Sequence, residues 1–386
     1  MAESKIELEK NRIKNIAFYL PQFYTFPEND KWWGNGFTEW TNVQKAKPLF
    51  KNHYQPTIPL NGYYSLNDNS TMRWQIDLAK KYGIDGFCFY HYWFGNDRQL
   101  MEKPVNRFLD DKSLDFSFCL SWANHNWTRT WVGDNKEILM DMQYGDEKEW
   151  QKHFDYLLPF FKDDRYIKID GKPVFIIYLP NEIHCLNQMI DFFKKCAKKN
   201  GLAGILFFAQ HGLSHQGELN NIDYFINYEP NWSLTTFYKQ KNNRFVYFPF
   251  TINVLIYRIK GFIKKITNGK LCKVRTYNYD FLWKYCLRKQ FESNKTVAGA
   301  FVHCDVTPRR QDRALIVKGN TPEKFKKYMI SLYDKIRKSP NLKIVFISAW
   351  NEWGEGMYLE PDEKNEFGYL EALCDSIKET TKNEVI

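Results

Sequence analysis

The sequence predicts an α/β fold, a (β/α)8 barrel, on three observations. An apolar, strand-like run followed by a helical pattern recurs along the chain, and there are eight such runs. The runs are apolar at nearly every position, as parallel strands buried on both faces require. Polar residues follow almost every run, which would gather them at the C-terminal rim of a barrel. A doubly wound open sheet is the alternative, and the count of eight favours the barrel.

The predicted strands are short and lie along the whole chain. They cover residues 16–20, 84–90, 116–120, 174–178, 205–209, 224–227, 300–303 and 344–348. Helical spacing of apolar residues predicts helices between them, over 71–81, 148–161, 182–200 and 322–338. The last helix opens with Thr321 and Pro322, which suit a cap and a first turn. One barrel with insertions can occupy all 386 residues, so we expect 1–386 to form a single domain.

The segment 237–289 breaks this alternation between the sixth and seventh predicted strands. We expect an insertion there, on the face of the barrel where the strands end. Residues 231–278 contain ten Lys or Arg and no Asp or Glu, whereas the net charge of the whole chain is +10. The basic character is therefore local, which points to one face that meets an anionic partner.

Within this segment, apolar residues at helical spacing alternate with basic ones. The apolar positions are Ile252, Leu255, Ile256, Ile259, Ile263 and Ile266, and the basic positions are Arg258, Lys260, Lys264 and Lys265. This pattern predicts a basic amphipathic helix that contacts an anionic membrane surface or glycan. An ordinary surface helix packed on the barrel is the alternative. The lysines are not interleaved with aromatic residues, so we expect no nucleic acid partner.

The opening stretch of the chain, MAESKIELEKNRIKN, is charged and lacks the apolar run of a secretory signal. We therefore expect a cytoplasmic protein, peripheral at the inner membrane face if the basic helix binds lipid. Aromatic residues make up 18% of the chain. That share suits a cleft in which flat apolar faces, such as those of sugars, stack on aromatic rings.

Two acids follow the last predicted strand. In the segment SAWNEWGEG (348–356), Glu352 and Glu355 lie three residues apart in a loop that contains glycine. Chemistry at a glycosidic bond requires such a pair, because one carboxyl group protonates the departing oxygen while the other acts as base or nucleophile. Two neighbouring acids also separate each other's pKa values, so that one stays protonated near neutral pH. We take Glu352 and Glu355 as the candidate catalytic residues; solvated loop acids or a helix cap are the alternatives.

Four long aromatic stretches carry a resemblance to a known family. They are FYLPQFYTFPENDKWWGNGFTEWTNV (18–43), GFCFYHYWF (86–94), SWANHNWTRTW (121–131) and ISAWNEWGEGMYLEP (347–361). Together they resemble the WbsX family of polysaccharide-biosynthesis glycosyltransferases, which is similar to the endo-α-mannosidases of glycoside hydrolase family 99. The resemblance extends along nearly the whole chain. It implies a (β/α)8 barrel and chemistry on glycans.

In the endo-mannosidases the motif at the acid pair is Glu-Trp-His-Glu, whereas this chain has a glycine, Gly354, in place of the histidine. The resemblance implies that Glu352 deprotonates the sugar 2-hydroxyl, which attacks the anomeric carbon to form an epoxide. It implies that Glu355 protonates the leaving oxygen and later activates the acceptor, with retention of configuration. The loss of the histidine affects the contacts expected with the donor sugar, whereas both acids of the motif are present.

Further candidates for sugar binding lie beside the predicted strand ends or in the motifs. They are Tyr19, Trp40, His91, Tyr92, Trp122, Asn124, His125, Glu229 and Asn351. For each, the alternative is a packed aromatic ring or a satisfied structural polar group. His303 and Asp305 follow the seventh strand, but no second cluster supplies further ligands, so we expect no metal and no other cofactor.

The expected function is glycosyl transfer in the synthesis of a surface polysaccharide, such as an O-antigen or capsule, with an oligosaccharide or lipid-linked glycan as substrate. Neither an Asp-x-Asp motif nor a glycine-rich phosphate loop occurs, so a transferase here would use retaining, hydrolase-like chemistry. An endo-acting, α-mannosidase-like hydrolase is the first alternative. A polysaccharide-binding barrel without catalysis is the second, and the presence of both acids disfavours it.

Overall fold

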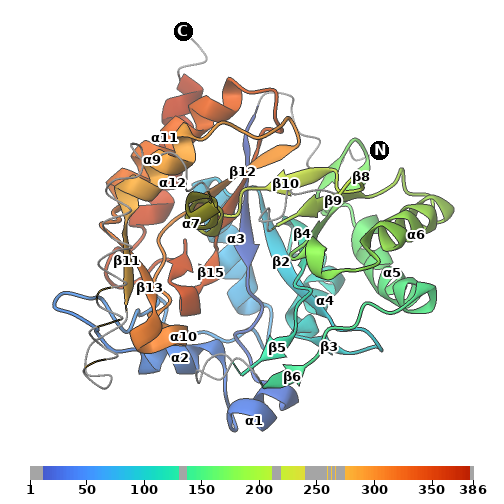
Figure 1. Ribbon diagram of the computed structural model, residues 1–386, viewed down its shortest axis with the longest axis horizontal. Helices are drawn as coiled ribbons and strands as arrows, with labels where there is room; N and C mark the ends of the chain where they lie inside the picture. Colours follow the sequence, from blue (N-terminus) through green and yellow to red (C-terminus); the bar gives the residue numbers. More distant parts are fainter. Residues whose placement is uncertain are drawn as a thin grey trace.

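The computed structural model describes residues 12–129, 137–210, 219–239 and 274–382, with Ile259, Phe262 and Ile266 in addition. Eight strands form a closed parallel barrel, which confirms the predicted fold (Figure 1). They are β1 (Lys14–Tyr19), β2 (Gly86–Trp93), β4 (Ser117–Trp122), β8 (Lys172–Ile177), β9 (Leu206–Ala209), β10 (Tyr224–Ile226), β12 (Thr296–Phe301) and β14 (Ile344–Ser348). Because β1 pairs in parallel with both β2 and β14, the ring has no open edge.

The two faces of each strand have different partners, as the two-residue period of a strand requires. Phe18 of β1 packs inside the barrel against Tyr90 of β2, Tyr228 after β10 and Phe346 of β14. Its neighbour Tyr19 faces outward, where its hydroxyl donates to Gln75 Oε1 at 2.6 Å. The interior is therefore an aromatic core, and the outer face of the strands packs on helices.

Helices surround the barrel. They are α3 (Ser70–Tyr82), α4 (Glu102–Asp110), α5 (Glu147–Lys162), α6 (Leu186–Lys199), α7 (Asn231–Lys239), α9 (Tyr279–Arg288), α11 (Pro322–Arg337) and α12 (Gly368–Lys382). Three of the four predicted helices agree within two residues, and the side chain of Thr321 caps α11 as expected. The fourth begins at Leu186, because residues 180–182 form a separate 3-10 turn.

The seventh strand is also displaced from its prediction. It was expected at 300–303 but covers Thr296–Phe301, because Gly299 interrupts the apolar run in the sequence. The glycine has a packing reason: a Cβ at this position would lie 1.8 Å from the carbonyl oxygen of Asn227. The backbone of β12 thus passes too close to Asn227 for a side chain at position 299, and the glycine that this requires interrupts the apolar run.

Much of the predicted insertion 237–289, including most of the basic amphipathic helix, lies outside the described residues. Its C-terminal part is not separate from the barrel. Strand β11 (Arg275–Asn278) pairs with β13 (Leu315–Lys318), and Trp283 of α9 stacks on Phe301 and Tyr328. The apolar side of α9 therefore packs in the outer layer of the barrel.

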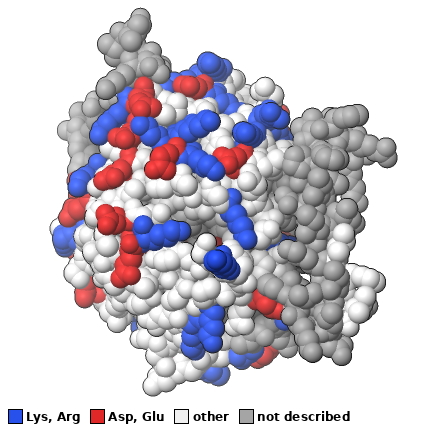
Figure 2. All heavy atoms as spheres, turned by 90° about the vertical axis from the view of Figure 1, so that its left-hand side faces the viewer, with Lys and Arg blue, Asp and Glu red and all other residues white. Residues whose placement is uncertain are grey.

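Basic and acidic side chains are interspersed over the outer helices α9, α11 and α12 (Figure 2). Lys324 pairs with Asp280 at 2.6 Å, and Lys326 pairs with Glu379 at 2.7 Å. In the part of the chain that the structure describes, no helix is long and apolar enough to cross a bilayer.

One end of the barrel carries the long connections, and it is the end where the strands finish (Figure 1). These connections contain α1 (Pro27–Trp33), α2 (Glu39–Lys45), α10 (Thr307–Arg310), the hairpin of β5 (Trp127–Thr128) with β6 (Ile138–Met140), and the pair β15 (Asn351–Glu352) with β16 (Met357–Tyr358). Two short strands, β3 (Gln99–Leu100) and β7 (Lys168–Ile169), pair antiparallel with the end of β2 and the start of β8.

Candidate functional site

The acid loop, residues 349–358, follows β14 at this rim. Its two short strands, β15 and β16, are joined by a 3-10 turn over residues 353–355. Asn351 ties the loop to the end of β1: its Oδ1 accepts from the Leu20 N–H at 2.7 Å, and its Nδ2 donates to the Leu20 carbonyl at 3.1 Å. Glu352 is 5% exposed, and the Glu355 side chain is 30% exposed. Both carboxyl groups therefore have positions fixed by the closing strands of the barrel.

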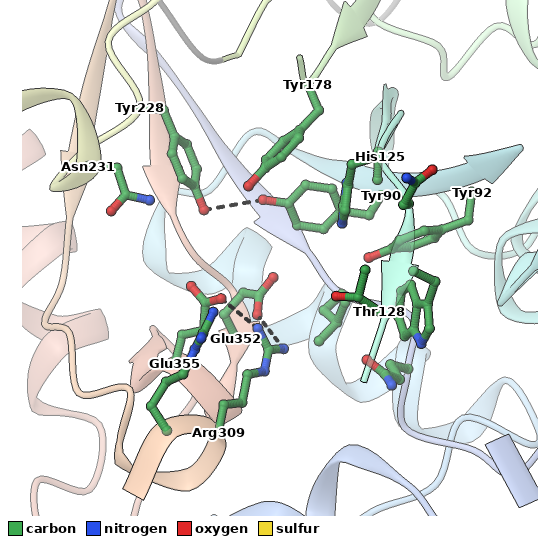
Figure 3. Close-up of a pocket in the computed structure, with 16 residues that line it drawn as sticks. Tyr90, Tyr92, His125, Thr128, Tyr178, Tyr228, Asn231, Arg309, Glu352 and Glu355 are labelled. Atoms are coloured by element: carbon green, nitrogen blue, oxygen red, sulfur yellow. Dashed lines mark hydrogen bonds and ion pairs between the residues drawn. The ribbon is translucent and has the colours of Figure 1, made fainter. Parts of the chain in front are cut away.

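Both acids line a cavity of about 300 Å³. Its walls come from the ends of six barrel strands and from α7, α10 and the β5–β6 hairpin. The lining residues are Leu20, Gln22, Tyr90, Tyr92, Ala123, His125, Asn126, Trp127, Thr128, Tyr178, Tyr228, Asn231, Arg309, Arg310, Glu352 and Glu355. In Figure 3 the phenols of Tyr90, Tyr178 and Tyr228 point across the cavity toward the two carboxyl groups.

Arg309 of α10 holds three acids at once. Its Nη1 lies 2.6 Å from Glu355 Oε1, its Nη2 lies 3.1 Å from Glu352 Oε2, and its Nε lies 2.8 Å from Glu39 Oε1. The guanidinium is planar and its donors have fixed directions, so it sets the two cavity acids relative to each other. Neither Arg309 nor Glu39 was among the residues expected from the sequence.

The glycine in the acid motif has a structural reason. A Cβ on Gly354 would lie 1.7 Å from Glu39 Oε1 and 2.7 Å from Arg309 Nε. Glu39, at the start of α2, is fully buried. The space beside the acid pair is thus filled by the Glu39–Arg309 ion pair, and a side chain at position 354 cannot share it.

Burial raises the pKa of Glu352 to about 8; the charge of Arg309 opposes this rise, and the charges of Glu355 and Glu39 add to it. Burial therefore favours the protonated form of Glu352. Burial also raises the pKa of Tyr90 and Tyr228 well above the usual range, so both remain phenols. The cavity thus offers hydrogen-bond donors on one side and an acid pair that retains a proton on the other.

A chain of hydrogen bonds fixes the orientation of the phenols. Ser121 Oγ donates to Gln210 Oε1 at 2.6 Å, and Gln210 Nε2 donates to the Tyr90 hydroxyl at 3.0 Å. The hydroxyls of Tyr90 and Tyr228 lie 3.3 Å apart. Because the chain starts within the barrel core, the polar end of the cavity is held rigidly.

Of the sugar-binding candidates, Tyr92 and His125 line the cavity beside the two acids. Burial lowers the pKa of His125 to about 4, so its ring is neutral. Tyr19 and His91 do not line the cavity: Tyr19 contacts α3, and His91 Nε2 lies 2.9 Å from His153 Nε2 of α5. The reason is strand alternation, since Tyr90 and Tyr92 face inward and the residue between them faces the helices.

The other five candidates are buried and do not line the cavity. Asn351 holds the acid loop, as described above. Trp40 donates from Nε1 to the Tyr64 carbonyl at 2.7 Å, and Trp122 donates to the Trp93 carbonyl at 2.8 Å. Asn124 exchanges two hydrogen bonds, each 2.8 Å long, with the backbone of Leu179. Trp122 also packs on His153 of α5, so it faces the outer helices and not the cavity.

Glu229 lies against α7, where it accepts hydrogen bonds from the hydroxyl and the N–H of Ser233. Its neighbour Tyr228 is the residue that lines the cavity. In the described residues, no group of three or more His, Cys, Asp or Glu side chains is placed to hold a metal ion. Asp305 instead pairs with His53 at 2.7 Å and accepts from Gln55 at 2.8 Å.

A closed (β/α)8 barrel with an acid pair in a polar cavity at its C-terminal rim is an arrangement typical of carbohydrate-active enzymes. Comparison with known sequences agrees with this class. The model of the family Glycosyltransferase WbsX matches residues 15–373, and the chain belongs to that family.

Two curated relatives are WxcX proteins of Xanthomonas campestris pv. campestris, both uncharacterised. One is 30% identical over 361 residues and the other, from strain B100, is 29% identical over 370 residues. Each alignment covers 92% of this chain and 48% of the relative. The chain therefore spans about half the length of the curated relatives that it matches.

Two solved structures share the fold. The GH99 endo-α-mannosidase of Bacteroides thetaiotaomicron has a TM-score of 0.53 at 14% identity, over 96% of this chain and 98% of that chain. A glycoside hydrolase-like protein has a TM-score of 0.56 at 14% identity, over 96% and 95%. At this identity the likeness shows the fold alone.

Proposed function

We propose that the protein makes or breaks glycosidic bonds of a surface polysaccharide or lipid-linked glycan, with Glu352 and Glu355 as its catalytic acids. The observation that carries the proposal is the joint contact of both acids with Arg309 at the wall of one cavity. Membership of the WbsX family favours glycosyl transfer for surface-polysaccharide synthesis as the reaction.

The chemistry requires one protonated and one ionised carboxyl group. The raised pKa of Glu352 supports such a state, because the pair then retains one proton near neutral pH. The raised pKa of Glu352 favours this proton on Glu352 in the free protein, whereas the resemblance to the endo-mannosidases gives the acid role to Glu355. We therefore propose that the two acids act together and that the reaction retains the anomeric configuration. Which acid is the general acid and which is the base is decided by the experiment below.

The function is tested with lipid-linked oligosaccharides and α-mannan fragments, whose products are identified by mass spectrometry. We expect new glycosidic products from the wild type, and a loss of at least about 100-fold in Glu352→Gln and in Glu355→Gln. Glu371→Gln on α12 is the matched control and should keep the wild-type rate, because Glu371 is exposed and lies outside the cavity. Wild-type rates in both cavity variants would remove the acids from the mechanism.

The two roles are separated by the leaving group. A substrate with a dinitrophenyl leaving group needs no protonation, so the variant that lacks the general acid keeps its activity on this substrate, and the variant that lacks the base does not. The wild-type rate should fall as pH rises through about 8, where Glu352 loses its proton. A rate that stays constant from pH 7 to 10 would contradict the one-proton pair.

Hydrolysis is the second candidate reaction, since water can replace the sugar acceptor in the same cavity. Isotopic water distinguishes the two, because oxygen-18 enters the new reducing end only on hydrolysis. A barrel that only binds glycan is the third candidate. It would predict equal glycan binding and no products in wild type and variants alike.

We also propose that the protein works at the cytoplasmic face of a membrane, where lipid-linked glycans are present. Ile259, Phe262 and Ile266 are 48%, 64% and 66% exposed, and their spacing of three and four residues puts them on one side of a helix. Exposed apolar side chains within a segment rich in Lys and Arg supply both contributions that surface binding needs, namely apolar insertion and attraction to anionic lipid.

Vesicle flotation tests this contact. We expect the wild type to float with vesicles that contain phosphatidylserine at low salt, and the double variant Phe262→Ser, Ile266→Ser to remain in solution. The control is Leu60→Ser, which changes an exposed apolar residue elsewhere on the barrel. Equal flotation of all three proteins would exclude this helix as the contact.

A further inference from the structure

Two successive arginines of α10, Arg309 and Arg310, line the cavity, and they differ in their partners. Arg310 lines the cavity next to Glu355, yet in the described chain its guanidinium makes no hydrogen bond or ion pair. The adjacent Arg309 differs, because the side chains of three acids, Glu39, Glu352 and Glu355, surround it. Arg309 therefore binds acids of the protein itself, whereas the guanidinium of Arg310 is available to a ligand in the cavity.

Further positive charge lies beside Arg310. The Arg310 side chain is exposed at the cavity mouth. Partial desolvation lowers the pKa of its guanidinium, the charge of Glu355 opposes this, and the charges of Arg309, Arg275 and Arg313 lower the pKa further. Arg313 is exposed and also lacks an ion pair in the described residues. Like charges gathered at a cavity mouth repel one another, and an anion bound between them relieves that repulsion.

Glu355 does not serve as this anion. Its carboxylate is 2.6 Å from Arg309 Nη1, and that charge-assisted bond is already formed. An uncommitted guanidinium offers paired donors in a plane, which match the oxygens of a phosphate or a carboxylate. The position of Arg310 beside Glu355 would place such a group close to the bond that reacts.

We propose that Arg310, assisted by Arg313, binds an anionic group of the substrate next to the scissile glycosidic bond. The inference rests on the proposed function, because it takes the cavity as the glycan site. Two sources supply this chemistry: the diphosphate of a lipid-linked donor, and the carboxylate of an acidic sugar. In either case the protein selects a charged substrate over its neutral counterpart.

Binding is measured by calorimetry at fixed ionic strength with two pairs of probes, geranyl diphosphate against geraniol and glucuronic acid against glucose. We expect at least one anion to bind about tenfold or more tightly than its neutral partner, and Arg310→Gln to remove this preference. Arg313→Gln should reduce it by a smaller factor. Arg288→Gln on α9 is the matched control, since Arg288 is exposed, has no ion pair in the described chain and does not line the cavity.

A preference for the diphosphate identifies a lipid-linked donor, and a preference for glucuronic acid identifies an acidic sugar. The inference is overturned if the wild type does not distinguish charged from neutral probes, or if Arg310→Gln and Arg288→Gln bind the anion equally. Its failure is distinct from failure of the function. Glycan products that need Glu352 and Glu355 without any charge preference refute the inference alone, and Arg310-dependent anion binding without glycan products refutes the function alone.

Discussion

Replacing Gly354 by alanine tests whether the Glu39–Arg309 ion pair occupies the space beside the acid pair. The added Cβ would lie 1.7 Å from Glu39 Oε1 and 2.7 Å from Arg309 Nε. Neither group can move freely, because Glu39 is fully buried and Arg309 is bonded to both cavity acids. The carboxylate of Glu39 must therefore swing away, which breaks its 2.8 Å contact with Arg309.

Two contributions set the size of the effect. Forcing an extra methyl group into a packed site costs about 1–3 kcal/mol, and separating a buried ion pair adds up to about 3–5 kcal/mol. Arg309 keeps two carboxylate partners, so the second contribution is partial. We expect the free energy of unfolding to fall by about 2–4 kcal/mol, and turnover to fall with it because Arg309 shifts relative to both acids.

Urea unfolding of Gly354→Ala, Glu39→Ala and the double variant provides the measurement. In the Glu39→Ala background the clash with the carboxylate is gone, so the alanine at 354 should cost less than about 1 kcal/mol. If the two single effects simply add in the double variant, Glu39 does not compete for this space and the explanation of the glycine is wrong.

Three further changes probe separate parts of the site. Burial raises the pKa of Glu229 from 4.5 to about 7, so the folded state binds the proton more tightly than the unfolded state. The free energy of unfolding should therefore fall by about 3 kcal/mol as pH rises from about 5 to 8. In Glu229→Gln, urea titrations should no longer show this decrease. Tyr228→Phe removes a phenol opposite the acids and should lower kcat at least about tenfold with little change in melting temperature. Asn351→Ala leaves the buried backbone of Leu20 unsatisfied and should cost about 2–4 kcal/mol by urea unfolding, whereas Asn351→Asp, which keeps the acceptor, should cost less.

The barrel was predictable because its evidence is local. Each strand is a short apolar run, and each run is followed by polar residues, so the count and the common rim follow from the sequence. The prediction failed where a tertiary contact changes the local pattern. Gly299 is the example, since the approach of the Asn227 carbonyl cannot be read from the residues around the glycine.

The site was only partly predictable, for two physical reasons. Neighbouring residues of a strand, such as His91 and Tyr92, point to opposite faces of the sheet. The sequence alone does not show which of the two faces the barrel interior. The Arg309 contacts join segments 43, 46 and 270 residues apart in the chain, and no spacing rule predicts such contacts. The presence of Glu39 within an aromatic motif was the only signal for this cluster.

The order in which the barrel closes bears on how the protein is made. Asn351 and Leu20, which bind the acid loop to the end of β1, are separated by 331 residues. During synthesis from the N-terminus, β1 therefore waits with one edge unpaired until β14 has emerged, and an unpaired apolar strand is prone to aggregation. The same delay means that a growing chain holds no acid pair, so chemistry that depends on that pair begins only after the ring has closed.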